Sequence, residues 1–268
     1  MQRHILDKHL KHYRAGHGLP RSFYHDLDLY QAELDLIWRR GWLFAALTCE
    51  IPNPGDYVTY DIAGDSILIV RRADGSIGAM HNVCRHRGSL VATSPIGQAV
   101  RFMCPYHQWT YDLDGTLLTC RGMPDTLDRS TLGLKPVHVR EMAGLIYINF
   151  AGSPIDFEAA AELMQPMAQP QGFDRARAAY SVDYDIPANW KIVWENNREC
   201  YHCDVNHPQY GKANNFDRYD ADTISERVAQ RCSLGGSRPD DHSSARGPGA
   251  VPGCRSQSVV LGQSHGPG

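Results

Sequence analysis

Two short segments combine cysteine and histidine within a β-rich stretch of sequence. The first reads CRHRGSL from Cys84 and the second CPYHQWTYDLDG from Cys104, so the pattern is Cys84-x-His86 followed by Cys104-x-x-His107. Two thiolates and two imidazoles suit either tetrahedral zinc or an iron–sulfur cluster. A zinc finger usually takes both cysteines from one knuckle, whereas here each segment supplies one cysteine and one histidine. This arrangement lets one iron take both thiolates and a second iron take both imidazoles.

The surrounding residues 57–150 alternate short β-rich runs with turn residues. The runs read YVTYDI, SILIVR, VRFM and LIYINF, and they contain many of the β-branched and aromatic residues that favour strands. The dipeptides at Asp74 and Asp114, each followed by glycine, predict hairpin turns. The sequence therefore predicts a small all-β unit that carries both cysteine–histidine segments.

Residues 26–40, DLDLYQAELDLIWRR, predict an amphipathic helix ahead of this unit. Asp26 or Asp28 can cap its first turn, and Gly41 follows its end. Its expected apolar face consists of Leu27, Tyr30, Leu34 and Ile37.

A second histidine pair follows another predicted helix, residues 189–202, which Asn189 can cap. His202 and His207 are five positions apart, so on a regular helix their side chains would point about 140° apart. They converge only if the helix ends between them, and Pro208 favours this because the residue before a proline avoids the helical conformation. We therefore predict that His202 lies on the last turn and His207 just past it.

Two histidines in this geometry leave one face of a metal open to a carboxylate, as in the facial triad of oxygen-activating iron(II). Cys200-x-x-Cys203 offers two alternatives, a zinc site with the same histidines or a redox pair. Zinc would need four ligands within eight residues, and a redox pair lacks a thioredoxin-like βαβ setting. A further interpretation makes both histidines ordinary surface or core residues.

Composition excludes several classes of protein. The 268 residues are 42% hydrophobic and 21% charged with a net charge of -3, which is ordinary for a globular chain and unlike a nucleic-acid binder. No apolar run approaches the roughly 18 to 20 residues that span a bilayer, and the polar N-terminus lacks an apolar signal core. We therefore expect a cytoplasmic protein with neither membrane nor nucleic-acid partners, whose eight cysteines stay reduced.

The N-terminal segment contains five histidines, for which a solvated arm is expected rather than a metal site: His4, His9, His12, His17 and His25.

The chain changes character towards its end. Residues 154–180 have helical composition interrupted by Pro166 and Pro170, and Gly, Pro and Ser dominate from Gly235 onward. Such a segment cannot bury enough apolar surface to offset the entropy lost on ordering. We predict that residues 237–268 are disordered, or that they form an anomalous C-terminal segment.

The two segments resemble the cluster loops of Rieske [2Fe–2S] domains. NWKIVWENNRECYHCDVNHP likewise resembles the mononuclear iron motif of Rieske non-haem iron oxygenase α subunits, and the resemblance covers roughly residues 20 to 235. It implies a Rieske cluster held by Cys84, His86, Cys104 and His107. Gln108 departs from the pattern, because many of these oxygenases have glycine after the second histidine.

The resemblance also implies an iron(II) ion bound by His202 and His207. It makes Glu199 the bridging carboxylate that joins a cluster histidine of one subunit to an iron histidine of the next, here His107 to His202. Asp204 is the alternative carboxylate, but it lies on another face of the helix. A ring-shaped homotrimer follows from this arrangement.

The implied fold class is α+β, with an all-β Rieske domain inserted before an incomplete, helix-grip-like catalytic domain with an antiparallel sheet. We place an N-terminal helical segment that packs on the catalytic domain at 1–41 and the Rieske domain at 42–152. The partial catalytic domain occupies 153–236, and the tail occupies 237–268.

The segments ENNRECYHC and VNHPQY, with glutamate at position 199, resemble the corresponding sequences of oxygenases that act on quaternary ammonium compounds, glycine betaine above all. The implied activity uses O2 and electrons from an NAD(P)H-dependent, ferredoxin-type reductase to hydroxylate an N-methyl group of a small substrate. The hydroxylated methyl group then leaves as formaldehyde. Two alternatives are an aromatic-ring-hydroxylating dioxygenase α subunit and a truncated chain whose cluster carries electrons without catalysis.

The facial triad also needs an acidic ligand, which in this family lies far beyond the two histidines. None of the acids after His207 has the family's position: Asp217, Asp220, Asp222, Glu226, Asp240 and Asp241. We therefore expect the resemblance to stop near Gly236 and the C-terminal half of the catalytic domain to be missing.

Overall fold

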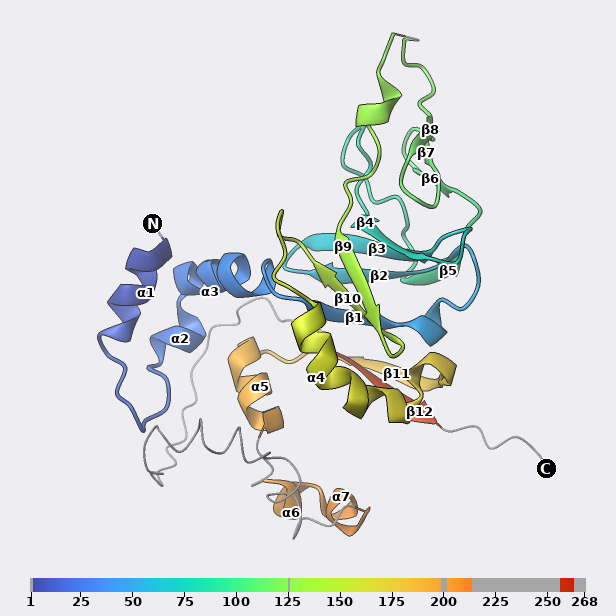
Figure 1. The fold of residues 1–268 in the computed structure, drawn as a ribbon. Helices are drawn as coiled ribbons and strands as arrows, with labels where there is room; N and C mark the ends of the chain where they lie inside the picture. The colour runs from blue at the N-terminus through green and yellow to red at the C-terminus, as the bar shows by residue number, and fades with distance from the viewer. Residues whose placement is uncertain (1, 125, 199–201, 214–255, 263–268) are drawn as a thin grey trace, which may run out of the picture. The chain divides into compact units, whose positions relative to one another are not determined.

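The computed structural model describes residues 2–124, 126–198, 202–213 and 256–262 and contains two compact units (Figure 1). One unit comprises residues 1–32 and 185–254, and the other comprises 33–184 and 255–268. The predicted mixture of helices and antiparallel sheet is confirmed. The two cysteine–histidine loops lie in the second unit, and the histidine pair near Pro208 lies in the first.

Three small antiparallel sheets build most of the second unit. A four-stranded sheet has the order β4-β3-β2-β5, with bounds Asp56–Ile62 (β2), Asp65–Arg71 (β3), Ile77–His81 (β4) and Ile96–Gln98 (β5). A three-stranded sheet has the order β1-β10-β9, with bounds Leu43–Leu47 (β1), His138–Met142 (β9) and Leu145–Asn149 (β10). The third sheet consists of Phe102–Met103 (β6), Thr110–Tyr111 (β7) and Leu117–Thr119 (β8). Short 3-10 turns occur at Thr48–Glu50 (η2), Arg129–Thr131 (η3), Gln169–Gln171 (η4) and Phe173–Arg175 (η5).

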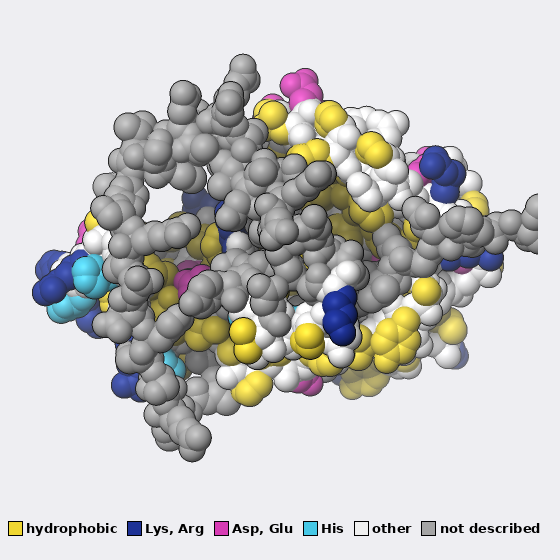
Figure 2. All heavy atoms as spheres, turned by 90° about the horizontal axis from the view of Figure 1, so that it is seen from below, with side chains coloured by type: hydrophobic (Ala, Val, Ile, Leu, Met, Phe, Trp, Pro, Cys, Tyr) yellow, Lys and Arg dark blue, Asp and Glu magenta, His cyan; other side chains and the backbone are white. Residues whose placement is uncertain are grey.

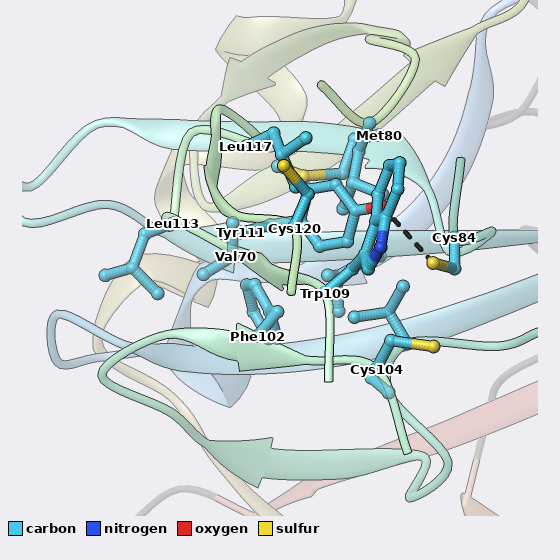
Figure 3. Packing of buried hydrophobic residues seen from close by; sticks show 14 residues of the cluster. Val70, Met80, Cys84, Phe102, Cys104, Trp109, Tyr111, Leu113, Leu117 and Cys120 are labelled. Carbon is cyan, nitrogen blue, oxygen red and sulfur yellow. Dashed lines mark hydrogen bonds between the residues drawn. The ribbon is translucent and has the colours of Figure 1, made fainter. Parts of the chain in front are cut away.

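Strand β3 contributes to two hydrophobic cores, because its side chains alternate between the faces of its sheet. Ile67 and Ile69 belong to the core that includes residues of β1 and β10. Leu68 and Val70 belong to a second core, which also contains cysteines of both cysteine–histidine loops (Figure 3). All four side chains are fully buried, which explains why ILIV at the centre of SILIVR is apolar without interruption.

The two predicted hairpin turns are confirmed. The turn at Asp74 joins β3 to β4, and the turn at Asp114 joins β7 to β8. In each turn the aspartate side chain accepts a hydrogen bond from a backbone N–H two residues on. Two further hairpins turn at Ala63 and Ala143, which have φ values of 50° and 51°. Neither was signalled by the sequence, because alanine rarely adopts a positive φ.

The residues after β10 form α4 (Glu158–Ala168) and β11 (Arg177–Tyr184). Pro166 lies inside α4, so the helix is not interrupted there as we expected. Residues 256–262 form a strand, β12 (Ser256–Gly262), which pairs antiparallel with β11. The prediction of a tail without regular structure is therefore wrong for this stretch, because backbone pairing needs no apolar periodicity. Residues 153–184 lie in the same compact unit as the sheets.

Helix α4 and strand β11 carry hydrophobic side chains that remain exposed: Leu163, Met164, Met167, Tyr180 and Tyr184. Figure 2, which views the molecule from below, shows hydrophobic side chains at several places on that surface. The buried side of α4 instead contributes Ala161 and Ala168 to a small core with Met142 and Phe157.

The described part of the first unit is helical. Its elements are α1 (Gln2–Leu10), α2 (Ser22–His25), the first residues of α3 (Leu27–Glu33), α5 (Trp190–Arg198), α6 (Cys203–Asn206) and α7 (Pro208–Ala213). The Asp26 side chain caps α3 by accepting a hydrogen bond from the Leu29 N–H at 3.0 Å. No helix among the described residues is long and apolar enough to cross a membrane.

The helix predicted for 26–40 is shorter than expected and changes geometry within its length. After α3 a π-helical turn, η1 (Leu34–Trp38), follows. Leu29 and Leu34 are buried, whereas Leu27 and Ile37 are 59% and 50% exposed. The expected apolar face is thus wrong at both ends, and at Ile37 the wider π-helical turn shifts the direction of the side chain.

His9 is an exception to the predicted solvated arm. Its side chain is buried, lies edge-on to the Phe23 ring, and has Nε2 3.4 Å from an Asp26 carboxylate oxygen. The other N-terminal histidines are exposed. Helix α1 is therefore attached to α2 and the start of α3 through one histidine.

Tyr24 on α2 joins the N-terminal helices to α5. Its hydroxyl donates to both carboxylate oxygens of Glu195, at 3.0 and 3.1 Å, and the Lys191 ammonium lies 5.9 Å from its ring centroid. Asn189 donates a hydrogen bond to the Tyr24 carbonyl. Burial, followed by the hydrogen bond and charge of Glu195, raises the Tyr24 pKa to about 12, so the hydroxyl keeps its proton at neutral pH.

We predict that Tyr24→Phe lowers the free energy of unfolding of the first unit by about 1 kcal/mol, because Glu195 is exposed and regains water. A folded-state pKa above the ordinary value of 10 stabilises the fold below pH 10, and this contribution is lost as the pH rises towards 12. The difference in unfolding free energy between wild type and Tyr24→Phe should therefore shrink between pH 10 and pH 12. Denaturant titrations at pH 8 and pH 11 measure this difference, with the exposed Tyr13→Phe as control. Equal losses in both variants would contradict the role of Glu195.

Candidate cluster and metal sites

The loop of residues 84–89 is closed by two backbone hydrogen bonds. The Cys84 N–H donates to the Ser89 carbonyl at 2.8 Å, and the Gly88 N–H donates to the Cys84 carbonyl at 3.0 Å. Gly88 has a φ of 74°, a conformation that glycine adopts at little cost. The loop thereby holds Cys84 and His86 two residues apart on one tight turn.

The loop of residues 104–109 repeats this geometry. The Cys104 N–H donates to the Trp109 carbonyl at 2.8 Å, and the Gln108 N–H donates to the Cys104 carbonyl at 3.0 Å. Gln108 occupies the position that corresponds to Gly88 and has a φ of 61°. The left-handed backbone explains why glycine is common after the second histidine in similar sequences. Gln108 tolerates it with backbone strain.

The loops bring like donors together in pairs. The Cys84 and Cys104 side chains are buried in the same hydrophobic core. The His86 and His107 rings are half-buried, and their centroids are 4.6 Å apart. Among the described residues, no three His, Cys, Asp or Glu side chains gather where one ion could bind them. A pair of thiols beside a pair of imidazoles therefore suits two iron atoms better than one zinc ion.

Both imidazoles carry a nitrogen without a hydrogen-bond partner in the described part of the chain. The Nδ1 atoms of His86 and His107 are buried and have no hydrogen-bond partner. An unsatisfied buried polar atom typically costs about 1–3 kcal/mol, and native structures contain few of them. Metal coordination through Nδ1 would satisfy both, so the donor set fits a [2Fe–2S] cluster with two cysteine and two histidine ligands.

The protonation of this donor set also suits metal binding. Burial alone raises the pKa of the Cys104 thiol, but hydrogen bonds from the Tyr106 and His107 N–H groups and from Cys84 outweigh it, so the pKa is lowered. Burial lowers the pKa of His107, and the positive charges of His86 and Arg87 lower it further. A thiolate and a neutral imidazole are the forms that bind metals.

Tyr111 acts on the other cysteine. Its hydroxyl lies 3.3 Å from Cys84 Sγ and accepts a hydrogen bond from the Arg85 N–H at 3.0 Å (Figure 3). Burial raises the pKa of the fully buried Tyr111, so it remains protonated and can donate to a thiolate. From the sequence, Tyr106, Trp109 and Tyr111 beside the second loop are expected only as an aromatic wall that shields a cluster from water. The hydrogen bond from Tyr111 to Cys84 had no signal in the sequence.

The expected aromatic wall is only partly formed. The Trp109 ring stacks on His86 with centroids 4.9 Å apart and an interplanar angle of 9°, and it is buried. Tyr106 contacts His107 at 3.8 Å between centroids but is 58% exposed. Tyr106 therefore covers a histidine without removing it from solvent.

Asn82 fixes the base of the first loop, a role that the sequence did not reveal. Its amide donates to the Ala92 carbonyl at 2.8 Å and to Ser66 Oγ at 3.2 Å. Its oxygen accepts hydrogen bonds from the Val91 and Ala92 N–H groups. One buried amide thus closes the chain around the Cys84 loop, and its only sequence signal is a polar residue in an apolar run.

The second candidate site lies after α5, which Asn189 caps as predicted by accepting from the Lys191 N–H. The centroids of the His202 and His207 rings are 5.5 Å apart. The predicted helix is described as α5 (Trp190–Arg198), its next three residues lie outside the described part of the chain, and the one-turn helix α6 lies between the histidines. His202 precedes α6, and His207 follows it with a φ of -130° and a ψ of 60°, a non-helical conformation expected before Pro208.

Several predicted ligands near this pair are not described. Glu199, Cys200, the side chain of Asp204 and the acids from Asp217 onward lie outside the described part of the chain. Cys203 is buried and disulfide-bonded, so it is not a thiolate ligand, and the expectation that all cysteines are reduced fails there. The structure thus brings two predicted iron ligands together without showing a third.

Two family models match the chain. Residues 41–132 match the Rieske [2Fe-2S] domain, and residues 173–251 match the catalytic domain of the ring hydroxylating alpha subunit. The chain therefore belongs to the proteins that join a Rieske [2Fe–2S] domain to this catalytic domain, and the two domains imply a Rieske cluster and a mononuclear iron. The catalytic match extends beyond Gly236, so the expected end of the resemblance is wrong, because a Gly- and Pro-rich composition does not exclude family sequence.

Within that class, relatives of this chain include oxygenase subunits of two monooxygenases. It is 41% identical over 193 residues to the glycine betaine monooxygenase oxygenase subunit of Pseudomonas aeruginosa, which covers 72% of this chain and 45% of the relative. It is 32% identical over 213 residues to the carnitine monooxygenase oxygenase subunit of Acinetobacter pittii, which covers 75% and 55%. The chain spans about half the length of these curated relatives.

The fold is similar to a solved quaternary ammonium Rieske monooxygenase. The TM-score is 0.68 at 30% sequence identity, and the match covers 72% of this chain and 54% of that chain. That solved structure gave insights into carnitine oxidation and inter-subunit electron transfer. The expected family and fold class are thereby confirmed.

We predict that Gln108→Gly changes the free energy of unfolding of the second unit by less than about 1 kcal/mol. The relief of left-handed strain offsets the greater flexibility of glycine in the unfolded chain. Gln108→Val should destabilise the unit by about 2 kcal/mol, because a β-branched residue is strongly disfavoured at positive φ. Thermal unfolding measures both, and Gln98→Val on strand β5 is the matched control. A Gln108→Val loss no larger than that of the control would contradict the strain.

Proposed function

We propose that this chain is part of a cytoplasmic terminal oxygenase that hydroxylates an N-methyl group of a small quaternary ammonium compound such as glycine betaine. The observation that carries the proposal is the pair of buried, unpartnered Nδ1 atoms beside two buried thiols. The 41% identity to a glycine betaine monooxygenase subunit supports the substrate class. Electrons come from NAD(P)H through a separate reductase of the ferredoxin type.

In this proposal Cys84 and Cys104 hold one iron of the cluster, and His86 and His107 hold the other through Nδ1. When bound, the cluster supplies one-electron transfer at a potential above that of all-cysteine clusters. The chain's own groups set its charge. Tyr111 donates to the Cys84 sulfur, and backbone N–H groups donate to Cys104, so negative charge on both sulfurs is stabilised.

His202 and His207 hold the mononuclear iron together with a carboxylate outside the described residues. When bound, that iron supplies the activation of O2. Glu199 accepts hydrogen bonds from His107 of one subunit and His202 of its neighbour, which orients both rings and couples the two sites across a subunit boundary. This role requires a ring-shaped homotrimer, and inter-subunit electron transfer in the solved relative supports it.

The reaction balances with one O2, two electrons and two protons per turnover. One oxygen atom enters an N-methyl C–H bond, and the other leaves as water. The hydroxymethyl ammonium product then breaks its C–N bond, releasing formaldehyde, a proton and the tertiary amine. NAD(P)H supplies the two electrons through the reductase.

A second candidate function is electron transfer by the cluster alone. It is favoured by one observation, that the described residues bring only His202 and His207 together at the iron site. The ratio of iron to sulfide separates the two candidates. Three irons per two sulfides support the oxygenase, and two irons per two sulfides support the electron carrier.

We predict that the protein, reconstituted anaerobically with iron and sulfide, assembles a cluster with two nitrogen ligands. ENDOR spectroscopy of the reduced, 15N-histidine-labelled protein should detect two strongly coupled nitrogens. His107→Cys should remove one coupling, whereas the exposed control His138→Ala should keep both. Coupling to no nitrogen, or binding of zinc without sulfide, would show that the cluster assignment is wrong.

We predict that Glu199→Ala leaves the cluster reducible but lowers formaldehyde release from glycine betaine by at least about 100-fold, because the route between the sites loses its hydrogen-bonded link. Formaldehyde is measured with the reductase and NAD(P)H, using the complete protein that contains this chain. The exposed Glu162→Ala on α4 is the control. Turnover comparable to wild type in Glu199→Ala would end the bridging proposal.

A further inference from the structure

Trp109 holds a buried hydrogen-bond donor that the protein leaves unpaired. The side chain is 3% exposed, and its indole Nε1 is buried without a partner. Donors of this kind are rare in native proteins because removing them from water without a new acceptor is costly. Trp42 in the same unit shows the usual outcome, since its Nε1 donates to the Ile155 carbonyl at 2.9 Å.

The surroundings of Trp109 define which acceptor could be missing. Its carbonyl closes the second cluster loop by accepting from the Cys104 N–H, and its ring stacks on His86 of the first loop. Its side chain belongs to the same buried core as Cys84 and Cys104, beside which Figure 3 draws it. Neither cysteine sulfur accepts a hydrogen bond from Nε1. A group held between the two loops would supply the missing acceptor.

We propose that Trp109 Nε1–H donates a hydrogen bond to an inorganic sulfide of the cluster and so raises the cluster's reduction potential. This inference rests on the cluster ligation proposed above. Reduction adds negative charge to the cluster, and a donor at a sulfur stabilises that charge, so the reduced state gains more than the oxidised state. Tyr111 already forms a hydrogen bond with the Cys84 sulfur. Trp109 acts on a different atom, and the two effects should add.

The first test compares midpoint potentials of reconstituted proteins by EPR-monitored redox titration. Trp109→Phe should shift the potential to a lower value while keeping the wild-type ratio of iron to sulfide. Trp42→Phe removes an indole donor that already has a protein acceptor, so it should leave the potential unchanged. Tyr111→Phe should lower the potential, and the double variant should show the sum of the two shifts.

A second test separates the hydrogen bond from packing. Replacing Trp109 by benzothienylalanine keeps the bicyclic ring and exchanges only the N–H for sulfur. The potential should fall as far as in Trp109→Phe. In 15N-indole-labelled protein, one indole N–H signal should be displaced by the reduced cluster, and it should be absent from Trp109→Phe.

The outcomes distinguish this inference from the function on which it rests. If wild type assembles no cluster with nitrogen ligands, the proposed cluster and the role of Trp109 fall together. If the cluster assembles but the benzothienylalanine protein keeps the wild-type potential, only the role of Trp109 is overturned. A lowered potential together with loss of the displaced indole signal supports it.

Discussion

The two-sided burial of strand β3 is the constraint on which the cluster site depends. Ile67 and Ile69 anchor the strand in one core, while Leu68 and Val70 form part of the core that contains Cys84 and Cys104. The loops are thus built on a strand that is packed from both sides. A site on a rigid scaffold keeps its donors in place in both redox states, which limits the reorganisation that accompanies electron transfer.

Three buried polar atoms lie where the cluster is proposed to bind and have no hydrogen-bond partner among the described residues. They are ring nitrogens of His86, His107 and Trp109, which belong to or directly follow the two loops. The amide of Asn82, at the base of the first loop, is satisfied instead by four hydrogen bonds. Open polar atoms beside a satisfied support are typical of a preorganised site that a bound group completes.

The first unit is organised around α5. Tyr24, Lys191 and Glu195 join the N-terminal helices to this helix, whose C-terminal end leads towards His202 and His207. The N-terminal segment therefore supports the helix that precedes the proposed iron ligands.

Local sequence signals were enough to predict the proposed sites: the spacing of Cys84, His86, Cys104 and His107, the turn residues around them, and the proline that ends the helical conformation after His202. These signals are local, since ligand type, turn propensity and proline geometry act over a few residues. Only the tertiary structure showed that Tyr111 reaches Cys84, that Asn82 closes the first loop, and that Nε1 of Trp109 has no acceptor. Each of these depends on which distant strands pack together, and burial decides whether a polar atom must find a partner.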